Sequence, residues 1–249
     1  MKQQKILLSL AVVMSALFYS CNNDSEKKEE APKTDAMTTA PAAPAAAPVT
    51  PAAPEKPGSF LLVVHKVANY AKWLPVYESD DSARSANGLS NYVLGRGIGS
   101  DSNTVLVAMK MADVAKAKAL TNSPFLKEKM KKGGVIGAPI SVNFTEVVWR
   151  DTSTNSMTTR VIVTHKVKDW DAWKKEFDSH KQARMDAGLV DRSIGHSVDD
   201  NHLVTLVFAI SDMAKAKAFM ASKDLKDKMA AAGVVGPPSF FYYTVAKKY

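Results

Sequence analysis

The apolar positions of this chain form two matching series, in which short aliphatic runs alternate with longer helical patterns. The short runs are rich in β-branched residues, which predicts strands. In the first series the predicted strands are residues 60–67, 89–98, 104–110 and 140–149. The second series begins with a strand at residues 160–167 and ends with one at residues 240–245. Helical patterns follow the first and third strands, so the order is β-α-β-β-α-β, that of a ferredoxin-like split βαβ unit.

The first predicted helix of each series has recognisable start and stop signals. Asn69 and Asp169 stand where these helices need an N-cap residue. Gly88 and Gly188 can supply the left-handed residue that follows the last helical turn. Pro75 lies inside the first of these helices, so we expect that helix to start late or to kink.

The second helical pattern of the first series is predicted in two pieces. Residues 112–121 form the first piece, and Ser123 then offers a second N-cap with Pro124 at the first helical position. Gly134 and its counterpart Gly233 are expected to end the pattern in the two series. We interpret the Gly-x-Pro segments that follow as turns, although they could also border a pocket.

The two series are a tandem repeat, because distinctive residues recur in register. Residues 65–88 read HKVANYAKWLPVYESDDSARSANG, and residues 165–188 read HKVKDWDAWKKEFDSHKQARMDAG. The match continues through two copies of AKAKA and two glycine- and proline-containing segments. We therefore predict one repeat at residues 59–150 and a second at residues 157–249.

The shared residues also resemble a known family. They are similar to the dimeric α/β-barrel superfamily, particularly its antibiotic-biosynthesis-monooxygenase-like proteins. The residues that carry this resemblance are the series H-K-V, W, F, A-R-x-x-x-G-L, A-K-A-K-A-F and G-V-V-G-P-P. Those proteins are usually single repeats that pair as homodimers. Over residues 59–249 the resemblance implies an α+β fold, in which two ferredoxin-like βαββαβ repeats pair within a monomeric chain as a fused α/β barrel. Family members include cofactor-independent oxygenases, haem-degrading enzymes, isomerases and proteins without known activity, so the resemblance does not identify a reaction.

Residues 1–20 have the features of an export signal. Lys2 and Lys5 precede an apolar run at residues 6–18, which is shorter than the roughly 20 residues of a transmembrane helix. The run leads to Cys21, and this resembles a bacterial lipoprotein signal, in which the cysteine becomes the lipidated first residue. We expect an exported lipoprotein of the bacterial cell envelope, anchored to the membrane through Cys21. An uncleaved anchor and an ordinary secretory signal are the alternatives.

Residues 21–58 are predicted to be a disordered tether. The acid-rich residues 24–30 resemble the surface-export signals of some Gram-negative lipoproteins, although charged tethers are common. Residues 31–58 are rich in Ala, Pro and Thr and contain no aromatic residue, so they cannot bury enough surface to fold. As polyproline II they would extend to about 85 Å, which would hold the repeats away from the membrane.

Charge and cysteine content limit the possible functions. The chain has a net charge of +8, all of which residues 59–249 carry. A basic domain favours anionic partners, but many lysines are interspersed along helical patterns, as on a solvated face. Predicted export disfavours nucleic-acid binding. One cysteine allows neither a disulfide framework nor a cysteine-based metal site, and no spacing of His, Asp and Glu indicates zinc.

One face of the first helix in each repeat could line a site. On a helical wheel the stripe consists of Trp73, Tyr77, Asp80 and Arg84 in the first repeat, and of Trp173, Phe177, His180 and Arg184 in the second. The aromatic pair is most simply a core face against the sheet. A buried arginine needs an acceptor, which Asp80 can supply to Arg84. Because His180 is a worse partner, Arg184 is expected either to reach solvent or to face a cleft between helix and sheet.

His65 and His165 lie near the end of the first strand of their repeats. A histidine there could be a general base or a metal or haem ligand, although a structural role is more common. Its best functional interpretation is a polar group in a mostly apolar pocket, beside the Trp and Arg of the first helix. In an oxygenase-like reaction the pocket would hold an aromatic substrate, and His65 or His165 would be the best candidate for assisting proton removal.

The sequence therefore favours a class of function without identifying a reaction. The first hypothesis is a lipid-anchored barrel that binds a small apolar or aromatic ligand without a cofactor. One alternative is a cofactor-independent monooxygenase-like or haem-handling enzyme, and another is a structural or protein-interaction module. The differences between Tyr77 and Phe177 and between Asp80 and His180 predict that the two sites are not equivalent.

Overall fold

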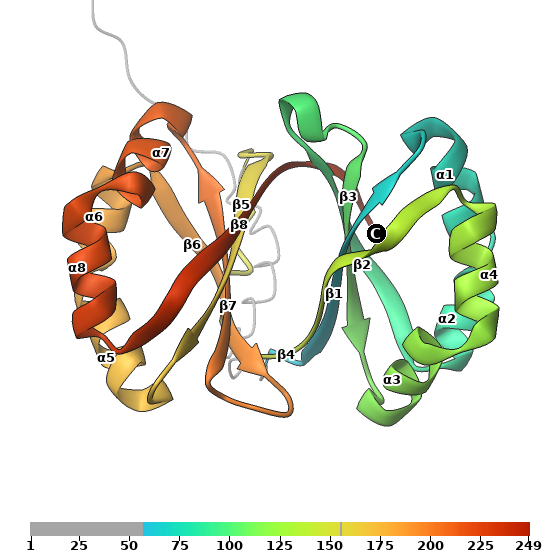
Figure 1. Ribbon diagram of the computed structural model, residues 1–249, viewed down its shortest axis with the longest axis horizontal. Helices are drawn as coiled ribbons and strands as arrows, with labels where there is room; N and C mark the ends of the chain where they lie inside the picture. The colour runs from blue at the N-terminus through green and yellow to red at the C-terminus, as the bar shows by residue number, and fades with distance from the viewer. Residues whose placement is uncertain (1–56, 155) are drawn as a thin grey trace, which may run out of the picture. The chain divides into compact units, whose positions relative to one another are not determined.

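Both repeats fold as split βαβ units, and each predicted helix is divided into two segments (Figure 1). The computed structural model describes residues 57–154 and 156–249. The elements of the first repeat are β1 (Ser59–Val67), α1 (Tyr70–Glu78), α2 (Asp81–Ala86), β2 (Leu89–Gly97), η1 (Gly99–Asp101), β3 (Thr104–Met111), α3 (Val114–Asn122), α4 (Pro124–Lys132) and β4 (Val135–Arg150). Those of the second are β5 (Thr159–Val167), α5 (Trp170–Ser179), α6 (Lys181–Asp186), β6 (Leu189–Ser197), β7 (Leu203–Ile210), α7 (Met213–Ala221), α8 (Lys223–Ala231) and β8 (Val234–Lys248).

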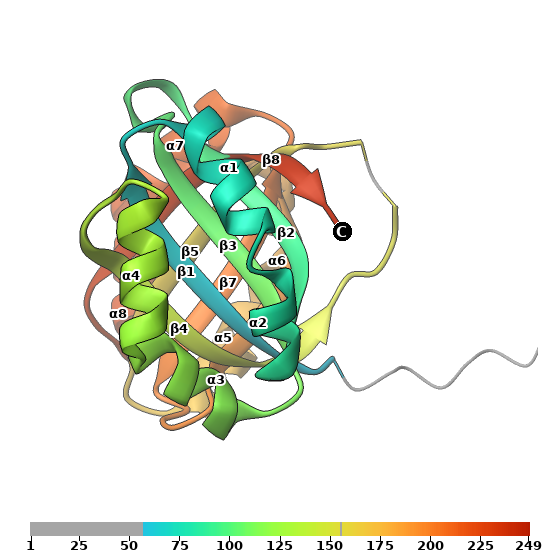
Figure 2. The ribbon, with the colours of Figure 1, turned by 90° about the vertical axis from the view of Figure 1, so that its right-hand side faces the viewer.

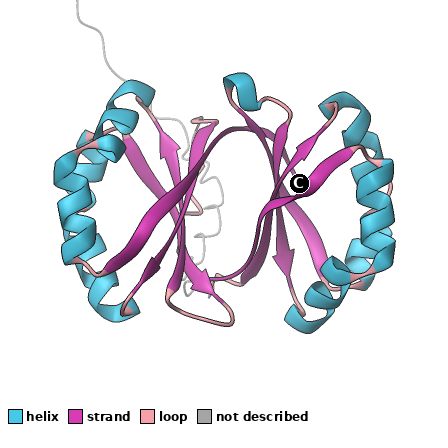
Figure 3. Ribbon diagram, in the orientation of Figure 1, coloured by secondary structure: helices cyan, strands magenta, loops and turns pink. Residues whose placement is uncertain are grey.

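Strands β1 to β8 close into one antiparallel barrel in the order β1-β3-β2-β8-β5-β7-β6-β4. Two seams join the repeats: β2 pairs with β8, with Arg96 opposite Thr244, and β4 pairs with β6, with Glu146 opposite His196. The helices of the first repeat cover one side of the barrel, and those of the second repeat cover the other (Figures 2 and 3). The prediction of a fused α/β barrel is therefore confirmed.

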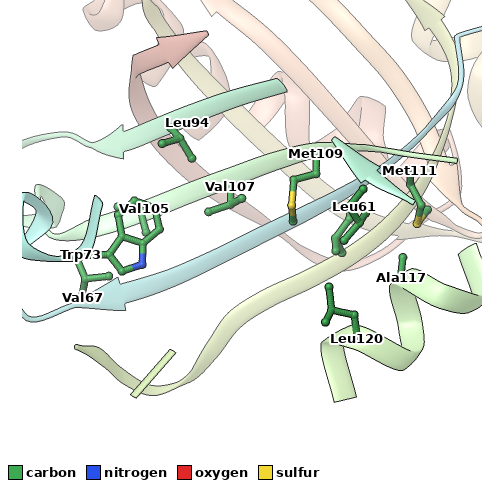
Figure 4. Close-up of a cluster of buried hydrophobic side chains, with 11 residues drawn as sticks. Leu61, Val67, Trp73, Leu94, Val105, Val107, Met109, Met111, Ala117 and Leu120 are labelled. Carbon is green, nitrogen blue, oxygen red and sulfur yellow. The ribbon is translucent and has the colours of Figure 1, made fainter. Parts of the chain in front are cut away.

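Successive residues of each strand face two different cores. Leu61 and Val67 of β1 face the helices and pack in a cluster that includes Trp73 (Figure 4). Phe60 and Leu62 point the other way, into the interior of the barrel. The second repeat has its own helix-side cluster. Each large apolar side chain that becomes fully buried stabilises the fold by about 1.5–3 kcal/mol, so these three clusters supply much of the driving force for folding.

The division of the first helix into two segments is not caused by proline. Helix α1 begins at Tyr70, directly after its N-cap Asn69, so the predicted late start is wrong. The helix continues through Pro75 and stops at Glu78. Helix α5 contains no proline and stops at nearly the same place, at Ser179. The division therefore belongs to both repeats and has a cause that they share.

The last strand of each repeat is longer than predicted, because it includes the Gly-x-Pro segment. Strands β4 and β8 pair with β1 and β5, and both pairings shift register opposite His65 and His165. Gly137 and Gly236 lie in these irregular segments with φ of 69° and 70°, which L side chains rarely adopt. The predicted turns are therefore bulges within strands, a feature often found next to functional sites.

The predictions for the N-terminal region concern residues that the structure does not describe. The export signal at residues 1–20, the lipid-attachment residue Cys21 and the tether up to residue 56 lie outside the described residues. Within residues 57–154 and 156–249, no helix is long and apolar enough to cross a membrane.

Candidate functional site

Each repeat has a pocket between its helices and its sheet. The pocket of the first repeat has a volume of about 100 Å³, and that of the second about 90 Å³. Strands β1 and β5 contribute the histidines, and the helical segments that follow them contribute the aromatic residues and arginines. The residues predicted for the site line these two pockets: His65, Trp73, Tyr77 and Arg84 in the first, and His165, Trp173, Phe177, His180 and Arg184 in the second.

The two histidines are deeply buried polar groups in these apolar pockets. His65 is 5% exposed and His165 is 6% exposed. Among the described residues, neither ring nitrogen of either histidine has a hydrogen-bond partner. The imidazole packs against the indole of the following helix, with ring centroids 5.6 Å apart for His65 and Trp73 and 5.3 Å apart for His165 and Trp173. An unsatisfied buried polar group costs about 1–3 kcal/mol, yet both repeats have one at the same position.

Burial lowers the pKa of His65 and His165 to about 4. Both imidazoles are therefore neutral at neutral pH, and each has one N–H donor and one acceptor nitrogen. A general base works best when its pKa lies near the operating pH, so these imidazoles are weak bases. Their environment suits hydrogen bonding to a neutral ligand better than proton removal.

A stack of three side chains forms the helical wall of each pocket. Trp73 stacks on Tyr77 with ring centroids 4.9 Å apart, and the guanidinium of Arg84 lies 3.9 Å from the centre of the Tyr77 ring. In the second repeat the corresponding distances are 5.1 Å and 3.6 Å. Such aromatic and cation–π contacts stabilise by about 0.5–2 kcal/mol each. The stripe predicted from the helical wheel is thus both a core face and a pocket wall.

The acceptors of Arg84 differ from the one predicted. Its Nη1 donates to the carbonyl oxygen of Tyr77 at 2.6 Å, and its Nη2 donates to Asp81 at 3.4 Å. The prediction that Asp80 accepts from Arg84 is therefore wrong. Asp80 instead pairs with Lys129 of α4 at 2.6 Å. The bond to the Tyr77 carbonyl, like that from Arg184 to the Phe177 carbonyl, lies where the first helical segment gives way to the second.

Arg184 is held still more firmly. Its Nε and Nη2 donate to the two carboxylate oxygens of Asp191 at 2.9 and 2.8 Å, and its Nη1 donates to the carbonyl oxygen of Phe177 at 2.5 Å. It is 5% exposed, so the predicted escape to solvent is wrong. Sequence reasoning missed Asp191. It could have been found as an acid on the helix-facing side of the strand that begins at Leu189, because a buried carboxylate needs a cationic partner.

The two pockets differ at their rims. The hydroxyl of Tyr77 donates to Asn91 at 2.5 Å, whereas Phe177 has no hydroxyl. The Asp80–Lys129 ion pair lies at the first pocket, and His180 takes the place of Asp80 at the second. The chemistry offered to a ligand is therefore different in the two repeats.

The pockets are small. Their volumes lie below the roughly 300–1,000 Å³ of sites for drug-sized ligands. In the described part of the chain, no group of three or more His, Asp or Glu side chains is arranged to hold a metal ion.

Comparison with known proteins identifies the architecture. No family model matches the sequence, and no curated protein matches it. Among solved structures, an anthrone oxidase-like protein superposes with a TM-score of 0.50 at 14% identity, over 78% of this chain and 94% of that chain. A chlorite dismutase variant from Candidatus Nitrospira defluvii gives a TM-score of 0.46 at 10% identity, over 75% of this chain and 90% of its own. At 14% identity the likeness to the anthrone oxidase-like protein shows the fold alone, an α+β barrel of ferredoxin-like repeats.

Proposed function

We propose that each repeat binds a small, neutral, largely apolar ligand in the pocket between its helices and its sheet. The observation that carries this proposal is the buried imidazole without a hydrogen-bond partner, which occurs in both repeats. A hydroxyl or similar group on the ligand would satisfy an imidazole nitrogen, and buried polar groups in native proteins are normally satisfied. The apolar and aromatic lining suits the rest of such a ligand.

The pocket volume limits the size of the ligand. At about 100 and 90 Å³ the pockets are smaller than the cavity of roughly 150 Å³ that holds benzene in another protein. A single aromatic ring therefore needs a small adjustment of the lining side chains, and a larger ligand needs more. Phenol is the natural probe, because its hydroxyl can donate to the acceptor nitrogen of a neutral imidazole.

An oxygenase acting on an aromatic substrate is the second candidate function. Its support is the neutral imidazole that packs against an indole and could accept a proton from an acidic aromatic substrate, on a fold shared with an anthrone oxidase-like protein. A pKa of about 4 makes each imidazole a poor proton acceptor at neutral pH, so binding is the primary proposal.

Calorimetric titration with phenol and with benzene tests the binding proposal. Phenol should bind about fivefold more tightly than benzene, because a hydrogen bond contributes about 1 kcal/mol. The double variant His65→Leu, His165→Leu should remove this difference while keeping the pockets apolar. Equal affinities for the two ligands in the unmodified protein would contradict the proposal. Oxygen uptake with an aromatic substrate that disappears in the folded double variant would establish the oxygenase instead.

We also propose that the barrel is tethered to the bacterial envelope by a lipid on Cys21. The support is the order of basic residues, apolar run and cysteine at the start of the sequence. Cys21→Ser should move the protein from the membrane fraction to the soluble fraction. A variant that stays in the membrane fraction contradicts lipid anchoring through this residue.

A further inference from the structure

A third cavity lies inside the barrel, where the strands rather than the helices enclose it. Its volume is about 380 Å³, which falls within the range of roughly 300–1,000 Å³ for small-molecule sites. All of the strands from β1 to β8 contribute to its lining, and none of its lining residues lines either helix-side pocket. Its apolar lining includes Leu62, Leu106, Ile162 and Val207.

The lining of this barrel cavity is strongly basic. Among the described residues that line it, the only carboxylate side chain is Asp151, and it pairs with Arg192. The remaining cationic side chains have no carboxylate partner within the described ranges. They are Lys110, Arg150, Arg160 and Lys248. A low-dielectric cavity with an excess of positive charge attracts an anion.

Polar groups that face this cavity are buried without adequate partners. Arg160 is 7% exposed, and among the described residues its side chain makes a single long hydrogen bond of 3.4 Å, to the carbonyl oxygen of Met157. Nε of Arg150 and Oγ1 of Thr145 are buried with no hydrogen-bond partner in the described structure. Leaving a buried charge uncompensated is strongly destabilising. An anion in the cavity would compensate the charge of Arg160.

The two repeats contribute different chemistry to the barrel cavity. Phe60 of β1 occupies the position that Arg160 occupies in β5, and Tyr92 of β2 occupies that of Arg192 in β6. The guanidinium of Arg150 lies 5.6 Å from the ring centres of both Phe60 and Tyr92. At these two positions the first repeat therefore presents aromatic rings and the second presents guanidinium groups, and Arg150 of the first repeat adds a third guanidinium. A homodimer could not offer this combination, because each residue would occur at both symmetry-related positions.

We infer that the barrel cavity binds one aromatic carboxylate, with its carboxylate between Arg160 and Arg150 and its ring against Phe60 and Tyr92. Guanidinium groups match the planar carboxylate and can donate two parallel hydrogen bonds to it. The aromatic residues and the aliphatic lining accommodate the apolar body of the ligand. This site is independent of the helix-side pockets and of their proposed function.

Titration calorimetry of the protein with 2-naphthoate and with neutral 2-naphthamide tests this inference. We expect one naphthoate per chain and at least tenfold weaker binding of the amide, which has nearly the same shape without the charge. Arg160→Met should weaken naphthoate binding at least tenfold, and Arg160→Lys should weaken it less because it retains the charge. Rising salt concentration should weaken naphthoate binding and leave amide binding nearly unchanged.

A matched control separates this site from general charge effects. Lys223→Met also removes one positive charge, but at a side chain that is 87% exposed on α8, and should leave naphthoate binding unchanged. Thermal unfolding of each variant shows whether it is folded, and Arg150→Met decides the question if Arg160→Met does not fold. Equal binding of naphthoate and naphthamide would overturn the inference. So would folded Arg150 or Arg160 variants that bind naphthoate as tightly as the parent.

Discussion

Both repeats have an arginine at the same position, and its contribution to the stability of the fold depends on how deeply its aspartate partner is buried. Asp81, the partner of Arg84, has a side chain that is 60% exposed, whereas Asp191, the partner of Arg184, is 10% exposed. An exposed ion pair stabilises by about 0–1 kcal/mol. Loss of one partner from a buried pair costs about 3–5 kcal/mol, because a buried charge is left uncompensated. The second repeat should therefore depend on its ion pair much more than the first.

Replacement of the two aspartates tests this difference. Asp191→Asn should lower the free energy of unfolding by about 3 kcal/mol, and Asp81→Asn should lower it by less than about 1 kcal/mol. Urea-induced unfolding of both variants beside the parent measures the two effects. Similar losses in the two variants would show that burial of the pair does not control its contribution.

The buried histidines should make stability depend on pH. Their pKa of about 4 in the folded protein lies below the ordinary value of 6.5, so the unfolded chain binds protons first as the pH falls. Their contribution is complete above about pH 6.5 and is lost as the pH falls toward 4. Between pH 7 and pH 5, each histidine should reduce the free energy of unfolding by about 2 kcal/mol.

The corresponding measurement is the free energy of unfolding at several pH values. The double variant His65→Leu, His165→Leu should lose less stability between pH 7 and pH 5 than the parent does. A double variant with the same pH dependence as the parent is incompatible with buried, neutral histidines.

The secondary-structure elements show which features follow from local sequence. The N-caps Asn69 and Ser123 accept backbone N–H groups as predicted, because capping involves only residues in the next turn. The division after α1 was not predictable, since it involves the bond from Arg84 to the carbonyl of Tyr77 in folded geometry. The bulge at Gly137 was missed for a similar reason, because it exists only in the pairing of β4 with β1.

Proline placement tests whether the helix division is independent of Pro75. Pro75→Ala should raise the free energy of unfolding, because the helix gains a backbone donor. Lys175→Pro places proline at the equivalent position of α5 and should lower the free energy of unfolding by about 3 kcal/mol. NMR chemical shifts should still show two helical segments after Pro75→Ala. A single continuous helix in that variant would make Pro75 the cause of the division.

The whole molecule shows how far a repeated pattern can predict a site. The pocket residues of the helix-side sites were found because strand alternation and helical periodicity place His65, Trp73 and Tyr77 on faces that meet. The barrel cavity was not predicted, because Phe60 and Arg160 come together only when the two repeats close on each other. Residues that occupy equivalent positions in a repeat can thus have different roles once they share a cavity.

Closure of the barrel predicts a monomer. The edge strands of each repeat are paired at the two seams, so no strand edge of the barrel is free to pair with another chain. Native mass spectrometry of residues 57–249 should give the mass of one chain over the micromolar concentration range. A stable dimer would require a different interface, and strand exchange between chains would then be the first explanation to examine.

The way in which the two repeats are joined has a further consequence. The chain passes from the end of β4 to the start of β5, and β4 pairs with β1 in the same manner as β8 pairs with β5. Because β8 also pairs with β2 as β4 pairs with β6, the end of β8 and the start of β1 stand in the same relation as the two strand ends that the natural connection joins. A circularly permuted chain that begins with β5 and ends with β4 should fold into the same barrel. The order in which the ribosome makes the two halves would then be interchangeable, because the seams rather than the connection between repeats determine the architecture.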